Sequence, residues 1–230
     1  MQRVYGLVAT AALLMSAVHA SAATVTFDFE DLTDQGFGTG FGNDASKVFP
    51  IVNIGGSNRM ETTLGGFQVA GRESQGMDAF LAALNQAAAN PGLSTISYDW
   101  YVDTSKAPLP ANNGTFLQFG TYINSGSGAY TQDFPGAGKD VELNGTQLAS
   151  GQVFSGTVTE TLTQKYGAIN PGHVSQTFQR LGLILNGDVT QDLKIYFDNV
   201  RIDAIPEPVS LALLAIATPA FLLRRRRWGR

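Results

Sequence analysis

The chain has 230 residues, with 15 basic and 19 acidic side chains, a formal net charge of −4 and no cysteine. The lack of cysteine excludes disulfides, thiolate metal sites and a cysteine nucleophile. The acidic balance argues against a general nucleic-acid-binding protein, which needs a basic surface to neutralise phosphates. A hydrophobic content of 43% argues against a largely disordered chain.

The first 22 residues have the features of a secretory signal peptide. Arg3 supplies a positive start, residues 7–18 form an uncharged apolar stretch, and Ala20-Ser21-Ala22 provides a small-x-small cleavage site. The alternative is a buried N-terminal helix. We predict that the chain is exported and that signal peptidase cleaves it after Ala22, or else after Ala20.

Residues 23–204 form the predicted exported domain. Its 24 glycines and many Thr, Ser and Asn residues separate short runs rich in Val, Ile, Phe and Tyr, which is typical of an all-β sandwich or barrel. We expect a glycine-rich loop at 36–43. We expect strands at 24–29, 47–54, 61–70, 94–103, 115–123, 141–143, 146–148, 152–163, 178–185 and 193–202.

Two local patterns add detail to this all-β prediction. Residues 77–89 carry apolar side chains at helical spacing and end at Asn90-Pro91-Gly92, which predicts one short helix packed against the sheets. Asn144-Gly145 is the preferred pair for a type I′ hairpin turn. It therefore predicts that 141–143 and 146–148 pair as a hairpin.

Alternation along two strands suggests a ligand surface. In 94–103, Ile96, Tyr98, Trp100 and Val102 share one face, so Asp99 and Tyr101 point the other way. In 115–123, inward Leu117, Phe119 and Ile123 leave Gln118 and Tyr122 outward. We expect one concave platform that stacks a sugar on tyrosine and binds it through polar groups. The alternatives are ordinary exposed residues or, with the faces inverted, Trp100 as the platform. The predicted carbohydrate-binding residues are Asp99, Tyr101, Gln118 and Tyr122.

Catalytic groups are scarce. After removal of the signal peptide, His173 is the only histidine, and no Gly-x-Ser-x-Gly elbow is present. Glycoside hydrolysis needs only two carboxylates, and no pattern singles out such a pair. Asp99 and Asp103 lie about 13 Å apart along an ideal strand, which is too far for a retaining pair. We therefore expect no enzyme activity.

The two ends of the domain carry a resemblance. The segments 27–32 (FDFEDL) and 195–202 (IYFDNVRI) resemble the first and last strands of jelly-roll carbohydrate-binding modules. This resemblance implies a jelly-roll-type β-sandwich and a structural calcium ion shared by the two strands. It further implies that Glu30 and Asp198 are side-chain ligands, with Asp28 as a third candidate, since calcium prefers several hard oxygen ligands.

The C-terminal segment 205–230 carries a second resemblance. Pro206-Glu207-Pro208 is followed by an uncharged apolar stretch, 209–223, and then by Arg224, Arg225, Arg226 and Arg227. This order resembles the PEP-CTERM sorting signal of exported proteins of Gram-negative bacteria that make exopolysaccharide. The resemblance implies transient anchoring in the inner membrane by a transmembrane sorting helix and processing by an exosortase. A plain C-terminal membrane anchor is the alternative.

Together these patterns predict an exported protein of the cell surface or extracellular matrix. Its sandwich is expected to bind carbohydrate, with exopolysaccharide as the ligand. The first alternative is a structural or adhesive biofilm matrix protein without a defined ligand. The second is a glycoside hydrolase-like enzyme. Signal peptidase, the exosortase and polysaccharide are the expected partners, nucleic acid is not, and one calcium ion is the only expected cofactor.

Overall fold

The computed structural model describes residues 22–39, 49–64, 68–106, 116–133, 139–188 and 193–206. The predicted signal peptide lies almost wholly outside these residues. So does most of the predicted sorting signal, including Glu207, Pro208 and the four arginines that follow the apolar stretch. Within the described ranges, no helix combines the length and apolar character that crossing a membrane requires.

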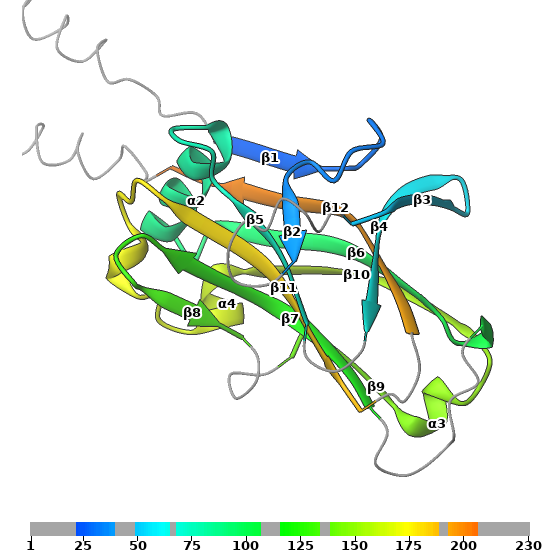
Figure 1. Cartoon of the computed structure of the whole chain (residues 1–230). Coiled ribbons are helices and arrows are strands. Elements are labelled where there is room, and N and C mark those ends of the chain that lie inside the picture. Colours follow the sequence, from blue (N-terminus) through cyan, green and yellow to red (C-terminus); the bar gives the residue numbers. More distant parts are fainter. Residues whose placement is uncertain are drawn as a thin grey trace, which may run out of the picture. The chain divides into compact units, whose positions relative to one another are not determined.

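The described residues form two six-stranded antiparallel sheets that pack face to face (Figure 1). We call them sheet A and sheet B. Sheet A has the order β10-β6-β12-β4-β3, and β1 also pairs with β12. Its strands are β1 (Ala23–Phe27), β3 (Ile51–Ile54), β4 (Ser57–Leu64), β6 (Thr95–Asp103), β10 (Val153–Thr161) and β12 (Leu193–Ala204).

Sheet B has the order β2-β5-β11-β7-β8, and β9 also pairs with β7. Its strands are β2 (Phe37–Thr39), β5 (Gln68–Glu73), β7 (Phe116–Ser125), β8 (Tyr130–Gln132), β9 (Val141–Asn144) and β11 (Gln179–Gly187). The two sheets together confirm the predicted all-β, jelly-roll-type sandwich.

The long strand β12 organises sheet A. One of its sides pairs with β6, while the other pairs first with β4 and then with β1. The register shifts between Asp198 and Arg201, where Asn199 has a φ of 48°. Asparagine tolerates this left-handed conformation better than most residues. The resulting bulge lets both halves of β12 keep their apolar side chains on the inner face.

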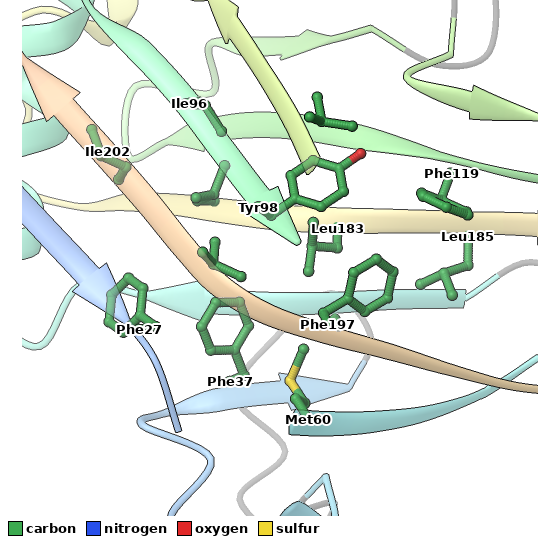
Figure 2. Packing of buried hydrophobic residues seen from close by; sticks show 14 of the residues in the cluster. Phe27, Phe37, Met60, Ile96, Tyr98, Phe119, Leu183, Leu185, Phe197 and Ile202 are labelled. Carbon is green, nitrogen blue, oxygen red and sulfur yellow. The ribbon is translucent and has the colours of Figure 1, made fainter. Parts of the chain in front are cut away.

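The core lies between the sheets and is rich in aromatic rings. Figure 2 shows Tyr98 of β6 and Phe197 of β12 close to Phe119 of β7. The Phe119 ring centroid lies 6.5 Å from that of Tyr98 and 5.7 Å from that of Phe197. Because these contacts join the two sheets, the inward faces predicted for β6 and β7 are confirmed.

The predicted helix is present as α2 (Ala79–Ala89). The side chain of Asp78 accepts a hydrogen bond from the backbone N–H of Leu81 and so caps the first turn. The helix buries Phe80, Leu81 and Leu84 and contacts β1 and β12. It therefore packs against sheet A at β1 and β12.

The predicted hairpin at Asn144-Gly145 is wrong. Asn144 instead begins α3 (Gly145–Leu148), since its side chain accepts from the Gln147 backbone N–H and the Gln147 side chain accepts in return. This reciprocal capping box satisfies two backbone donors at the start of the helix. Residues 146–148 are helical as a result, and β9 pairs with β7 instead.

Other predicted boundaries also change. The strand expected at 61–70, with an interruption at Gly65-Gly66, is two strands, β4 and β5, which belong to different sheets. The loop expected at 36–43 contains β2. Short helices that alternation did not indicate are α4 (Leu162–Tyr166), which follows β10, and the 3-10 turns η1 (Thr104–Lys106) and η2 (Pro171–His173).

Candidate functional site

The outer face of sheet A carries a row of polar and aromatic side chains. Ser155 of β10, Tyr101 of β6, Tyr196 of β12 and Glu61 of β4 are successive cross-strand partners. Each of the two tyrosines is flanked in sequence by core residues, so both side chains point away from the core. The pleat and the register therefore bring two tyrosines together in the middle of this face.

The two tyrosines form an edge-to-face pair with Arg59 beside it. The ring centroids of Tyr101 and Tyr196 are 5.8 Å apart at an interplanar angle of 64°. The Arg59 guanidinium carbon lies 5.1 Å from the centroid of Tyr101. Tyr196 is 6% exposed, and burial, followed by the nearby Glu61 carboxylate, raises its pKa. Tyr101 is half-buried, so it is the member of the pair that a ligand can reach.

Hydrogen-bonded polar groups lie beside the tyrosines. Asp99 accepts a hydrogen bond of 2.5 Å from the Thr157 hydroxyl and one of 2.8 Å from the Asn199 side-chain amide. The bulge of β12 places Asn199 opposite β6 and makes the second bond available. We refer to Arg59, Asp99, Tyr101, Thr157, Tyr196 and Asn199 as the tyrosine platform.

The outer face of sheet B is built differently. A Cβ on Gly182 would lie 1.9 Å from the Tyr122 ring, and one on Gly71 would lie 2.2 Å from the Arg180 guanidinium. Both side chains therefore lie flat across a neighbouring strand. Tyr122 is fully buried with Val69 and Ile184 in a second apolar cluster.

Charged and polar groups border this second cluster. Arg180 forms a 3.1 Å ion pair with Glu73, and both side chains are largely buried. Gln118 lies beside Glu142, with a hydrogen bond of 3.4 Å between their side chains. Tyr130 contacts the Tyr122 ring at 5.8 Å and is 43% exposed.

The single platform predicted from the sequence is wrong. Asp99 and Tyr101 lie on the outer face of sheet A, whereas Gln118 and Tyr122 lie on the outer face of sheet B. The inner faces of β6 and β7 meet in the core, so their outward residues point in opposite directions. Tyr122 is also fully buried and offers no ring face for stacking. Asp99 and Tyr101 keep their predicted exposure, and their strand neighbours complete a different surface.

The predicted calcium ligands lie near one hairpin. Glu30 accepts from the backbone N–H and the side-chain amide of Asn58. Asp198 accepts from the hydroxyl of Ser57 and, at 2.7 Å, from the backbone N–H of Asn199. Burial raises the pKa of Asp198. Glu30 and Asp198 thus each bind the start of β4, through Asn58 and Ser57, respectively.

These carboxylates do not fit a calcium site as they are placed. Both carboxylate oxygens of Glu30 and both of Asp198 already accept a hydrogen bond from the protein. Oδ1 of Asp28 accepts from the Glu30 backbone and from the Gln35 side chain. Across the described ranges, no group of three or more His, Asp or Glu side chains is arranged to hold a metal ion. The hydrogen bonds tie both strands to the β3–β4 turn directly, and the calcium ion stays a prediction.

His173 lies in the interior. Its Nε2 is 2.8 Å from the Thr131 hydroxyl, its backbone carbonyl accepts from Gln179, and burial lowers its pKa. The side chain is fully buried, so it is out of reach of an external substrate. Its contacts are those of a packing residue.

Comparisons with known proteins find similarity in structure. No family model and no curated protein matches the sequence. A family 28 carbohydrate-binding module specific for non-crystalline cellulose superposes with a TM-score of 0.50 at 18% identity, over 76% of this chain and 90% of that chain. A family 11 module from Clostridium thermocellum, solved with a β-1,3-1,4-mixed-linked tetrasaccharide, gives 0.38 at 13% identity, over 81% and 98%. At such identities the similarity to the family 28 module shows the fold alone.

Four members of the tyrosine platform, Arg59, Thr157, Tyr196 and Asn199, escaped the sequence reasoning. Alternation along 193–202 already places Tyr196 on the face opposite Ile195 and Phe197, so its outward direction could have been read. The neighbours of Tyr196 could not be predicted, because they depend on β12 lying between β6 and β4. The position of Arg59 beside the tyrosines depends on the same strand order. The position of Asn199 depends on that order and on the bulge in β12.

Proposed function

We propose that the protein binds carbohydrate through the tyrosine platform. The observation that carries this proposal is the Tyr101–Tyr196 pair, set among hydrogen-bonding groups on the outer face of sheet A. The sandwich fold, which this chain has in common with a module specific for non-crystalline cellulose, supports the same function. The ligand is a polysaccharide, and exopolysaccharide is the class that the predicted sorting signal indicates.

The chemistry of the platform suits a sugar chain. A pyranose presents an apolar C–H face that packs on an aromatic ring, and hydroxyl groups around its rim that need hydrogen-bond partners. Tyr101 offers the ring, while Tyr196 supports it from the side. Thr157, Asp99 and Asn199 offer a hydroxyl, a carboxylate and an amide within the same network. Arg59 adds donors beside the Tyr101 ring.

The proposal includes the cellular role that the two termini indicate. The signal-peptide pattern supports export, and the Pro-Glu-Pro motif with its apolar stretch and arginines supports exosortase sorting in a Gram-negative bacterium. The protein then holds polysaccharide at the cell surface or in the extracellular matrix. The proposed role is binding rather than catalysis, since the platform supplies a ring for stacking and hydrogen-bonding groups around it.

The test compares one tyrosine on each outer face. Tyr101→Ala removes the ring of the platform, and Tyr130→Ala is its matched control because Tyr130 is partly exposed on the opposite sheet. Binding of the full chain to the producer's exopolysaccharide and to soluble β-glucans is measured by affinity electrophoresis and calorimetry. We expect Tyr101→Ala to weaken binding about tenfold or more, equivalent to about 1.4 kcal/mol, and Tyr130→Ala to leave it unchanged.

Two outcomes would overturn the proposal. If Tyr130→Ala abolishes binding and Tyr101→Ala does not, the ligand surface belongs to sheet B. If no polysaccharide binds the folded wild-type chain, the protein is a structural or adhesive matrix component without a defined glycan. Circular dichroism of both variants confirms that a loss of binding is not a loss of folding.

A further inference from the structure

A buried cluster of charged groups lies between the sheets, away from the tyrosine platform. Lys165 of α4 places its Nζ 2.6 Å from Oδ2 of Asp140 and 3.5 Å from Oδ2 of Asp133. The exposed fractions of the three side chains are 0%, 2% and 4%, respectively. An amine thus meets two buried carboxyl groups, and the partly exposed Glu160 carboxylate lies 4.0 Å from the same amine.

Aromatic and hydroxyl groups surround this cluster. The Tyr98 hydroxyl donates a 2.5 Å hydrogen bond to Oδ2 of Asp140, and Lys165 Nζ lies 5.6 Å from the centre of the Tyr98 ring. Asp133 accepts from the backbone N–H of Thr121 at 2.7 Å. The Thr121 hydroxyl in turn lies 2.6 Å from that of Tyr166. Both carboxyl groups are thereby held in place.

The protonation state of Asp133 differs from that of an ordinary aspartate. Burial and the neighbouring Asp140 carboxylate raise the pKa of Asp133 to about 8. Asp133 therefore carries a proton at neutral pH, next to the ion pair of Lys165 and Asp140. Burying such an ion pair costs solvation free energy that its mutual attraction only partly returns.

We propose that Lys165 and Asp140 join through an intramolecular amide bond between Nζ and Cγ. In the low-polarity site a proton moves from the Lys165 ammonium to Oδ1 of the Asp140 carboxylate, with Asp133 as the carrier, which gives a neutral amine beside a carboxylic acid. The amine attacks Cγ, and the Tyr98 hydroxyl stabilises the negative charge that collects on Oδ2.

Asp133 completes the reaction as a proton carrier. Its protonated carboxyl group gives a proton to the departing oxygen of Asp140, Oδ1, and the resulting carboxylate takes one from the attacking nitrogen. That oxygen leaves as water and Asp133 regains its starting form, so the net change is ammonium plus carboxylate to amide plus water. No oxidant or other reactant is needed. The fixed proximity of amine and carboxyl replaces the activation that amide formation otherwise requires.

The bond would connect the two sheets covalently. Lys165 belongs to α4, which directly follows β10 of sheet A, and Asp140 directly precedes β9 of sheet B. The chain has no cysteine, so this amide would serve where an exported domain often has a disulfide. It would also replace two buried charges by a neutral group.

Peptide mapping of the full chain tests the bond directly. Trypsin cleaves after lysine and arginine, and between Lys139 and Arg180 the only such residue is Lys165. Without the bond, the products are the separate peptides 140–165 and 166–180. With the bond, Lys165 resists cleavage, and we expect one species, 140–180, with a mass lower by one water molecule. Separate peptides from the wild type, or 140–180 at its full mass, would overturn the proposal.

Variants assign the roles. Asp133→Asn keeps the size of the side chain and removes the proton carrier, so we expect the separate peptides 140–165 and 166–180. Lys194→Met removes an exposed lysine that pairs with Glu61 on sheet A, and this control should still give the dehydrated 140–180 species. A dehydrated species in Asp133→Asn would overturn the role of Asp133. The wild-type map decides on the bond itself, even if a variant fails to fold.

Discussion

The outer faces of the two sheets place tyrosines in different environments. On sheet A, Tyr101 is half-buried, while Thr157 and Asn199 beside it are exposed. On sheet B, Tyr122 lies flat over Gly182 and is fully buried with Val69 and Ile184. An outward direction on a strand therefore does not guarantee exposure. Tyr122 packs along the sheet over Gly182, whereas Tyr101 keeps a partly accessible ring beside Tyr196.

The largest expected effect comes from truncating the same residue type on each face. Tyr122→Ala should destabilise the protein by about 3–5 kcal/mol, because it empties a buried aromatic site. Tyr101→Ala should cost about 1 kcal/mol or less, because its ring is only half-buried. Urea denaturation of both variants at pH 7 measures the difference. Equal losses would mean that the two faces do not differ in packing.

A smaller effect is expected at Gly182. Gly182→Ala places a methyl group against the Tyr122 ring and should cost about 1–3 kcal/mol through overpacking. In a Tyr122→Ala background the same change should cost less, since the ring is gone. A double-mutant cycle by denaturation gives the coupling free energy. Additive effects would show that the close approach of the ring is not the reason for glycine at this position.

The third prediction concerns alkaline pH. Burial, only partly opposed by Arg180, raises the pKa of Tyr122 well above its ordinary value of 10.0. The hydroxyl then stays protonated in the folded state while the unfolded chain loses its proton, so this contribution to stability is complete below pH 10 and falls as the pH rises further.

Tyr122→Phe removes the ionisable hydroxyl and with it this loss of stability at alkaline pH. Its stability relative to the wild type should improve by about 1.4 kcal/mol per pH unit above pH 10. Urea denaturation at pH 8 and pH 11 measures this change. A wild-type to variant difference that is the same at both pH values would contradict a buried Tyr122 hydroxyl.

The smallest effect is expected on sheet A. Thr157→Ala removes a hydrogen bond to Asp99 at an exposed position, and exposed substitutions of this kind usually change stability by about 0.5 kcal/mol or less. Thermal unfolding checks this value. A loss above 2 kcal/mol would show that the network of Asp99 supports the sheet rather than an accessible surface.

The sequence predicted which way the side chains of a strand point better than it predicted where that strand lies in its sheet. The alternation of 94–103 gave the boundaries of β6 and the correct inner face, because every second side chain of a strand points the same way. It carried no information on which strands lie beside β6. The error at Asn144 has a similar origin, since an asparagine serves both a hairpin turn and a helix N-cap, and here Gln147 three residues later decides for the helix.

The residues of the candidate sites also differ in how far the sequence predicted them. Asp99 and Tyr101 could be selected from their own strand, whereas Tyr196 and Arg59 became neighbours only through the order β6-β12-β4. The cluster of Lys165, Asp133 and Asp140 had no local signal at all. Its members come from three separate segments that only the closed sandwich brings together.

The central position of β12 has a consequence for folding. It is the last of the described strands, yet it pairs with β6, β4 and β1, which are all made earlier. Until residues 193–204 emerge, these three strands lack their shared neighbour and sheet A stays open at its middle. Completion of the sandwich is therefore a late event that closes contacts distant in sequence, which slows folding. Under the export that we propose, a chain whose sandwich is completed only by residues 193–204 stays unfolded while it passes through a secretion channel.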